Sequence, residues 1–188
     1  MIASHTPITP EQLLAMPDSK GLEIVRGKLV EKPMGYESSE LGARLTVILG
    51  AYLLRHQSGR ITGADAGFQC FPDDPTKFRK PDLALVSYAK LPPTQRVGAY
   101  CKVAPDLAVE VLSPNDEAKE IGDRVKDFLG AGTPLVWVVD EFLRQVIVYS
   151  TTAAPKVFCL GDELTAEPVL PGFKCQVNEI FAGIPSCE

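Results

Sequence analysis

The chain lacks the residue patterns that several large classes of protein require. No apolar run reaches the roughly 18 residues that suggest a membrane span, and the most apolar helical stretch, residues 41–54, contains Arg44. Only two histidines are present, His5 and His56, which argues against a histidine-rich metal site and a serine–histidine–aspartate triad. Residues 1–10 carry neither the basic nor the apolar region of a signal peptide, so we expect a cytoplasmic location and no membrane association.

Cysteine is present but not in a pattern that builds a site. The five cysteines are odd in number, and no two are spaced as Cys-x-x-Cys, so neither a disulfide framework nor a zinc site is predicted. Any chemistry must therefore come from carboxylates, lysines, serines or cysteines. The 188 residues are 45% hydrophobic and 23% charged, which is typical of a globular protein. We expect a single domain over residues 1–188.

The net charge of −5 argues against broad non-specific binding to nucleic acid, but the charge is unevenly distributed. Residues 77–102 contain six basic side chains and one acidic one, Asp82. One interpretation is that these are the residues of basic connecting loops. The other is a local strip that faces phosphate groups on an otherwise acidic protein.

Local patterns predict a mixed α/β order of elements. Thr9, Pro10 and Gln12 form a capping box for a short helix that ends near Met16. Glycine, proline and capping residues then divide the chain into elements. They are a hairpin of residues 22–26 and 28–32, a long helix capped by Ser38 or Ser39 and running to about 57, strands at 60–63, 68–71, 82–87 and 107–112, a helix opened by residues 113–116 and running to about 129, strands at 134–140 and 144–150, and a last strand pair with a turn at 178–181.

Two carboxylates interrupt apolar strands. Asp82 begins one strand and shares a face with Ala84 and Val86, because side chains alternate along a strand. Glu110 lies inside the next strand, on the face of Ala108 and Leu112. An unpaired buried carboxylate is costly, so each requires a cationic, backbone or metal partner. Two of them on one face would form an oxygen site suited to Mg²⁺.

The helix that follows supplies candidate lysines. Its apolar stripe consists of Ile121, Val125, Phe128 and Leu129. Lys126 falls at the margin of this stripe, and Lys119 lies two turns earlier at nearly the same azimuth. A lysine at the margin can reach a carboxylate site, although such side chains more often extend along the surface into solvent.

These segments resemble the Uma2 family, a group of bacterial domains in the PD-(D/E)xK restriction-endonuclease-like superfamily. The resemblance covers nearly the whole chain and is carried by residues 21–30, 79–87, 104–116, 123–140 and 170–173. Its most specific parts are the Glu-Val-Leu-Ser-Pro and Trp-Val-Val-Asp sequences. The resemblance implies a mixed central sheet flanked by two main helices, and a nuclease site that depends on Mg²⁺ or Mn²⁺.

Site residues are implied by the same resemblance. Asp82 matches the aspartate of the PD motif and Glu110 its second acid, both as metal ligands, and Glu23 matches an N-terminal acid. The motif lysine would stand at Leu112, and Lys126 matches a lysine on the following helix that takes its place. In this interpretation Asp82, Glu110, Lys126 and Glu23 are catalytic.

The implied partner is nucleic acid, with DNA favoured, and a homodimer is possible. Lys77, Arg79 and Lys80 would hold its phosphates. Many relatives carry a histidine near residues 37–40, where this chain has Ser38 and Ser39. That difference, with the net negative charge, favours an alternative: a catalytically silent binding or dimerisation module that retains the nuclease fold. A third interpretation is a structural domain in which Glu110 and Lys126 form a buried ion pair.

Overall fold

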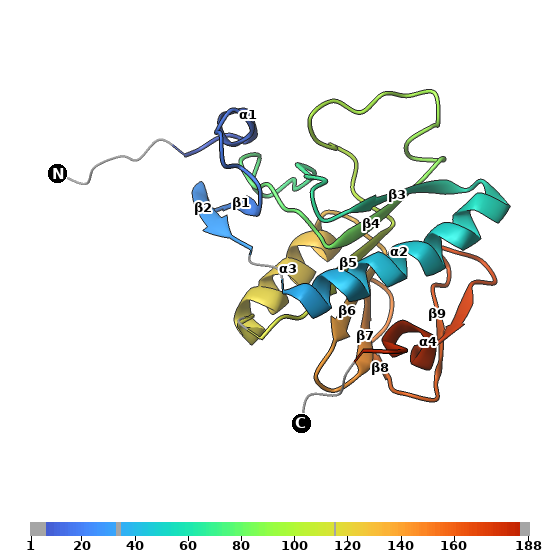
Figure 1. The fold of residues 1–188 in the computed structure, drawn as a ribbon. Coiled ribbons are helices and arrows are strands. Elements are labelled where there is room, and N and C mark those ends of the chain that lie inside the picture. The colour runs from blue at the N-terminus through green and yellow to red at the C-terminus, as the bar shows by residue number, and fades with distance from the viewer. Residues whose placement is uncertain (1–6, 33–34, 115, 185–188) are drawn as a thin grey trace.

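The structure is a computed structural model, and it describes residues 7–32, 35–114 and 116–184. Its centre is a mixed six-stranded sheet with the order β3-β4-β5-β6-β7-β8 (Figure 1). Only β5 and β6 are parallel, and every other neighbouring pair is antiparallel. The six strands are β3 (Gly59–Gly63), β4 (Leu83–Ser87), β5 (Leu107–Val111), β6 (Leu135–Asp140), β7 (Gln145–Ser150) and β8 (Lys156–Phe158).

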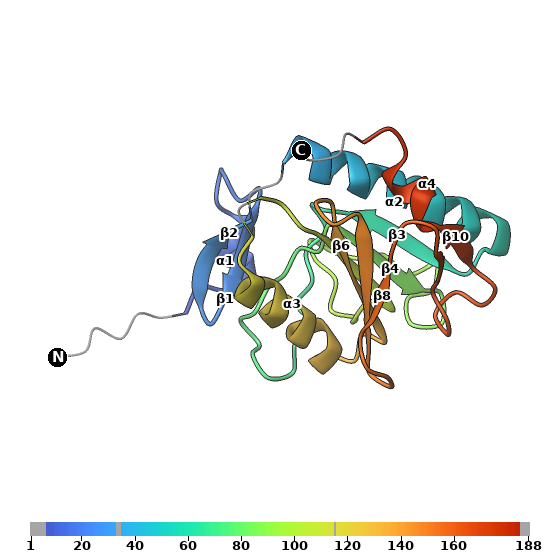
Figure 2. The same ribbon diagram turned by 90° about the horizontal axis from the view of Figure 1, so that it is seen from below.

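Two long helices enclose this sheet. α2 (Tyr36–His56) covers one face and α3 (Ala118–Gly130) the other, with the sheet between them (Figure 2). The expected α/β architecture is therefore confirmed. The shorter elements are α1 (Pro10–Leu14), α4 (Val177–Phe181), the hairpin of β1 (Leu22–Val25) and β2 (Lys28–Glu31), and the antiparallel pair of β9 (Glu163–Thr165) and β10 (Lys174–Gln176). No helix in the described part of the chain is long and apolar enough to cross a membrane.

Alternation along the strands separates two cores. In β5, Leu107, Val109 and Val111 belong to the cluster that includes the α2 leucines. Ala108 belongs to a second cluster, with Val125 and Phe128 of α3. Since successive side chains point to opposite faces, Glu110 lies on the α3 side of the sheet. The face that the sequence predicted for Glu110 is the one observed.

Several predicted boundaries were wrong for local reasons. The long helix begins at Tyr36 with Gly35 as its N-cap, and Ser38 lies inside it. α3 begins at Ala118 rather than at 113–116, because the Ser113 amide and hydroxyl both donate to Asp116 and form a separate turn; Asn115 lies outside the described residues. Residues 68–71 form no strand, and Phe68 makes only isolated bridges. The capping box of α1 is confirmed.

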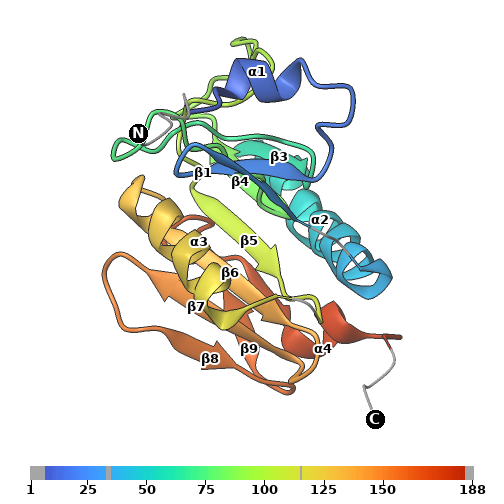
Figure 3. The ribbon, with the colours of Figure 1, turned by 90° about the vertical axis from the view of Figure 1, so that its left-hand side faces the viewer.

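The β1–β2 hairpin lies to one side of the central sheet (Figure 1, Figure 2 and Figure 3), against the segment that leads into β4. Ile24 and Phe78 exchange two backbone hydrogen bonds of 2.9 Å. Phe68 and Arg79 exchange another pair, of 2.8 and 3.0 Å. The segment around residue 79 therefore joins the hairpin to the body of the protein. Gly67 permits this packing, because a side chain there would overlap the ring of the buried Phe78.

We expect Gly67→Ala to destabilise the fold by about 1–3 kcal/mol, because the added methyl group must displace a fully buried aromatic ring. Urea unfolding would measure the change. Gly63→Ala is the matched control, since an added methyl group there meets no atom within 4 Å and surface changes of this kind are worth about 0.5 kcal/mol or less. Equal stability of the two variants would contradict the role assigned to Gly67.

Candidate active site

Asp82 and Glu110 meet across two neighbouring strands. Leu83 pairs with Val109 in the β4–β5 register, so the antiparallel register places position 82 opposite position 110. Both carboxylates are buried, with 7% and 1% of the residue exposed. The Asp82 Oδ2 atom accepts a 2.7 Å hydrogen bond from the amide of Val111, which fixes the carboxylate against β5. The structure thus brings together the two acids that the sequence predicted would share a site.

Lys32 joins these carboxylates, a contact that the sequence did not predict. It follows β2 directly, and its Nζ atom lies 2.8 Å from Asp82 Oδ1 and 2.7 Å from Glu110 Oε2. The same atom donates a 2.9 Å hydrogen bond to the carbonyl oxygen of Lys80. Three oxygens therefore surround the ammonium group; we call them the oxygen cage. The other oxygen of Glu110, Oε1, is buried with no hydrogen-bond partner.

Glu23 forms the second half of the site and is completely buried. Its Oε1 atom accepts hydrogen bonds from the amide of Lys80 at 2.7 Å and from Arg124 at 2.8 Å. Its Oε2 atom accepts one from Arg79 at 3.0 Å. Arg124 also lies 3.8 Å from Glu110 Oε2. One arginine on α3 therefore connects Glu23 to the oxygen cage.

The protonation of the site follows from burial and these neighbours. Burial raises the pKa of Glu110, and the opposing effects of Lys32 and Arg124 do not cancel it. Burial alone would lower the pKa of Lys32, but Glu110 and Asp82 raise it above its ordinary value, so the ammonium stays protonated. Burial would raise the pKa of Glu23, yet Arg124, Arg79 and Lys32 together lower it. Glu23 therefore remains an anion.

Lys77, Arg79 and Lys80, the expected phosphate contacts, are all buried. Lys77 pairs with Asp127 at 2.7 Å and with Asp73 at 2.9 Å. Arg79 pairs with Asp127 at 2.6 Å as well as with Glu23, and the Lys80 ammonium donates to a backbone carbonyl. Each of the three side chains therefore already has an internal partner. Contact of these residues with nucleic acid stays a prediction.

The predicted lysine of α3 lies outside the oxygen cage. Lys126 is exposed and lines a cavity of about 450 Å³ together with Arg26, Asp123 and Asp127. Lys119 is also exposed. Within the described ranges, Glu110 pairs with Lys32 and Arg124, so the Glu110–Lys126 ion pair of the structural interpretation is not observed. A catalytic role for Lys126 stays a prediction.

A signal for Arg124 was present in the sequence. Position 124 stands three residues after Ile121 and four before Phe128, which places it about 40° beyond Phe128, at the margin of the apolar stripe opposite to Lys126. A charged side chain at this margin can also reach a buried partner. For Lys32 no local signal existed, because its partners are 50 and 78 residues further along the chain.

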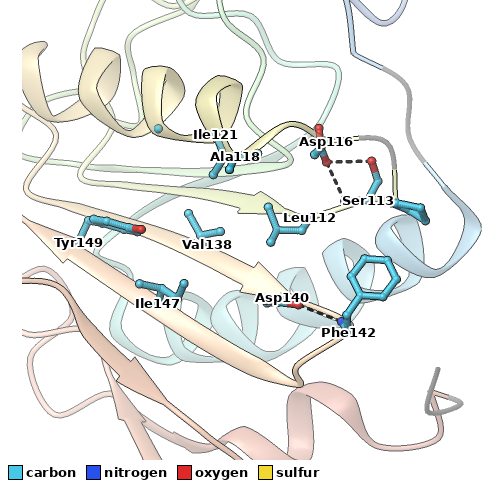
Figure 4. Close-up of a pocket in the computed structure, with 12 residues that line it drawn as sticks. Leu112, Ser113, Asp116, Ala118, Ile121, Val138, Asp140, Phe142, Ile147 and Tyr149 are labelled. Carbon is cyan, nitrogen blue, oxygen red and sulfur yellow. Dashed lines mark hydrogen bonds between the residues drawn. The ribbon is translucent and has the colours of Figure 1, made fainter. Parts of the chain in front are cut away.

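A second, mostly apolar cavity of about 400 Å³ is lined by residues of β6, β7 and the start of α3, on the face of the sheet that α3 covers (Figure 4). Leu112, which stands where the motif lysine was expected, lines it together with Val138 and Ile147. Its Asp116 and Asp140 carboxylates accept hydrogen bonds from nearby backbone amides. An apolar side chain at 112 thus belongs to the wall of this cavity, and the charge of the site comes from elsewhere.

The oxygen cage has the donor chemistry of a divalent cation site, although it offers only three oxygen atoms. The two carboxylates and the carbonyl are hard oxygens of the kind that Mg²⁺ and Mn²⁺ prefer, and the unpartnered Oε1 of Glu110 offers a further ligand atom. Among the described residues, no group of three or more His, Cys, Asp and Glu side chains is placed to hold a metal ion. Glu23 cannot serve as the third, because both of its oxygens accept hydrogen bonds from cations.

We expect Glu23→Gln to destabilise the fold by about 3–5 kcal/mol, because it leaves two buried arginines without their shared anion. Thermal and urea unfolding at neutral pH would measure the loss. Glu31→Gln, on the exposed edge of the same hairpin, is the control and should change stability by about 0.5 kcal/mol or less. A Glu23→Gln variant as stable as this control would contradict the interpretation of Glu23 as the anion that holds the network.

Comparison with known proteins identifies the family and the fold. The chain matches the model of the Uma2 family, described as “Putative restriction endonuclease”, over residues 10–178. No curated protein matches it by sequence. Its fold is similar to a crystal structure from Anabaena variabilis described as “a putative nuclease belonging to DUF820”. The two are 19% identical with a TM-score of 0.79, over 93% of this chain and 98% of that one. This protein therefore belongs to the Uma2 family of restriction-endonuclease-like proteins.

Proposed function

We propose that this protein is a nuclease that hydrolyses phosphodiester bonds in DNA with the help of Mg²⁺ or Mn²⁺. The observation that carries the proposal is the oxygen cage, where Asp82 and Glu110 converge on one cationic position with a backbone carbonyl. Membership of a family described as restriction endonucleases supports nucleic acid as the substrate. Asp82 and Glu110 are the proposed metal ligands.

Lys32 is central to this proposal, because its ammonium occupies the position that a divalent cation would take. Two like charges cannot share a cage with three oxygens at these distances, so metal binding requires Lys32 to leave the centre of the cage. A metal ion bound there would polarise a phosphate oxygen and lower the pKa of a bound water. Displaced from the cage, the Lys32 ammonium would donate hydrogen bonds to the phosphate that undergoes attack.

The remaining residues hold this arrangement. Asp82 is oriented by the amide of Val111, so its Oδ1 atom faces the cage. Glu23 holds Arg124 beside Glu110, and Arg124 offsets negative charge that would accumulate during attack on phosphorus. In this proposal Glu23 positions other groups and does not itself touch the substrate. Lys126, which lines the cavity of about 450 Å³, remains a candidate for contact with the substrate.

The alternative function, a catalytically silent module, is favoured by one specific observation. The charges of the site are internally paired, since the Lys32 ammonium forms ion pairs with both carboxylates. In such a module the ammonium would stay in the cage permanently, and Lys32, Asp82 and Glu110 would serve only to hold the hairpin on the sheet.

Substitution of Lys32 distinguishes the nuclease from the silent module. We expect Lys32→Met to bind Mn²⁺ about tenfold or more tightly than the wild type, because a competing cation has been removed from the cage. Cleavage of plasmid DNA should fall by about 100-fold, the usual effect of losing one preorganised charge stabiliser. Calorimetric titration with Mn²⁺ and a gel assay would measure both. Lys28→Met, on the exposed side of β2, is the control.

The carboxylates should behave differently. In Asp82→Asn and Glu110→Gln both Mn²⁺ binding and cleavage should be lost, since a ligand has been removed, with circular dichroism verifying the fold. Lys126→Met, tested in the same assay, decides whether that lysine takes part. A wild-type protein that binds no Mn²⁺, together with a Lys32→Met variant that is only less stable, would overturn the nuclease and leave the silent module.

A further inference from the structure

The helix α2 is apolar on two opposite faces. One face carries Leu41, Leu45, Leu49 and Leu53, all buried in the core. The other face carries Tyr36, Ala43, Val47, Gly50 and Leu54, which recur every three to seven residues and so form one stripe along the helix. We call this second face the outer stripe. By helical geometry it lies about 180° from the core leucines.

The outer stripe is open to solvent in the described structure. Tyr36, Val47 and Leu54 are exposed by 81%, 70% and 82%, and α2 lies at the periphery of the molecule in two perpendicular views (Figures 2 and 3). An amphipathic helix on a protein surface normally presents polar residues outward. A continuous exposed apolar surface of this kind is typical of an interaction site.

We propose that the outer stripe is the interface with a second copy of this chain, whose α2 packs antiparallel to the first. The observation that identifies the occupant is the order of large and small residues. When Ala43 lies opposite Leu54 of the second copy, Val47 lies opposite its Gly50. Twofold symmetry then repeats both contacts. Each bulky side chain meets a small residue, as an interdigitated interface requires.

A parallel arrangement lacks this fit. It would place Val47 against Val47 and Gly50 against Gly50. The two valines would then be crowded, and a gap would remain between the two glycines. In the antiparallel register, each pair of facing residues between Ala43 and Leu54 contains one large and one small side chain. The paired part of the stripe, from Ala43 to Leu54, spans about 16 Å at 1.5 Å per residue, and Tyr36 lies beyond the end of the second helix.

Charges beside the stripe favour the same register. Glu40 and Arg55 lie on the same flank of the outer stripe, and twofold symmetry keeps that flank facing its counterpart. In the proposed register Glu40 and Arg55 of the second copy are offset by about two residues, or about 3 Å along the axis. Glu40 already pairs with Arg44 in its own helix at 3.1 Å, so the dimer would extend this pair into a charge network across the interface.

The dimer would leave the candidate active sites on its two outer sides. α2 covers one face of the sheet, and the oxygen cage lies on the opposite face, near α3. The proposal is therefore independent of the nuclease function, and each can fail without the other.

The test uses two glycines of the same helix. An added side chain meets no atom within 4 Å at either Gly50 or Gly42, but only Gly50 belongs to the outer stripe. Gln is a better helix former than Gly, so Gly50→Gln should leave the fold as stable as before while placing bulk where Val47 of the second copy must fit. Sedimentation equilibrium should show the wild type as a dimer. The dimer dissociation constant should rise by about tenfold or more in Gly50→Gln and stay unchanged in Gly42→Gln.

The register has its own test in a pair of charge reversals. Glu40→Arg and Arg55→Glu should each weaken the dimer, and the double variant should recover it, because the interhelical pairs are rebuilt with opposite sign. Three results would overturn the proposal: a wild type that is monomeric at about 100 μM, a dimer that Gly50→Gln leaves intact, or a double variant no better than the single ones. Mn²⁺ binding per chain should be equal in Gly50→Gln and the wild type, whatever the outcome for the nuclease.

Discussion

The structure depends on the cost of burying carboxylates. Glu23, Asp82 and Glu110 all lie inside the protein, where an uncompensated anion would cost several kcal/mol or become protonated. Lys32, Arg79 and Arg124 supply the balancing charges. Three anions face three cations, and ion pairs connect all six. These ion pairs therefore help to fix the orientation of each segment that carries one of the six residues.

This requirement explains how the hairpin is attached. Strands β1 and β2 form a sheet of their own, separate from the central one. The hairpin nevertheless contributes Glu23 from its first strand and Lys32 from the end of its second, both bound deep in the network. On the opposite side, α3 contributes Arg124. The hairpin packs its apolar residues against α1 and Phe78, and α3 packs against the sheet. Directional, charged contacts thus give both elements a specific orientation. The same orientation makes the candidate site.

The fold could be predicted from the sequence because its signals are local. The capping box of α1, the apolar period of α2 and the alternation of β5 each depend on residues a few positions apart, and each appears in the structure. Asp82 and Glu110 could be brought together because their strands are consecutive in chain order and antiparallel neighbours in the sheet. Boundaries were less accurate where side chains compete with the backbone, as Ser113 and Asp116 do before α3.

The cations of the site could be predicted only in part, and the reason is physical. Lys126 was chosen because a lysine at the margin of an apolar stripe can reach a buried acid. Arg124, at the opposite margin of the stripe, is the side chain that reaches Glu23 and approaches Glu110. Lys32 comes from a hairpin whose packing is determined by distant contacts such as Ile24–Phe78. Its role depends on tertiary structure that no local pattern contains.

The sheet also separates two surfaces of different chemistry. Alternation along β5 directs Glu110 toward α3 and Val109 toward α2, so the buried charges lie on the α3 face beside its apolar core. α2 contributes no charged residue to the oxygen cage. In the proposed nuclease, a substitution at the oxygen cage would act on the metal ligands and leave the outer stripe unchanged. The nuclease and the silent module share one fold, and they differ in whether the Lys32 ammonium leaves the proposed metal position or stays in it.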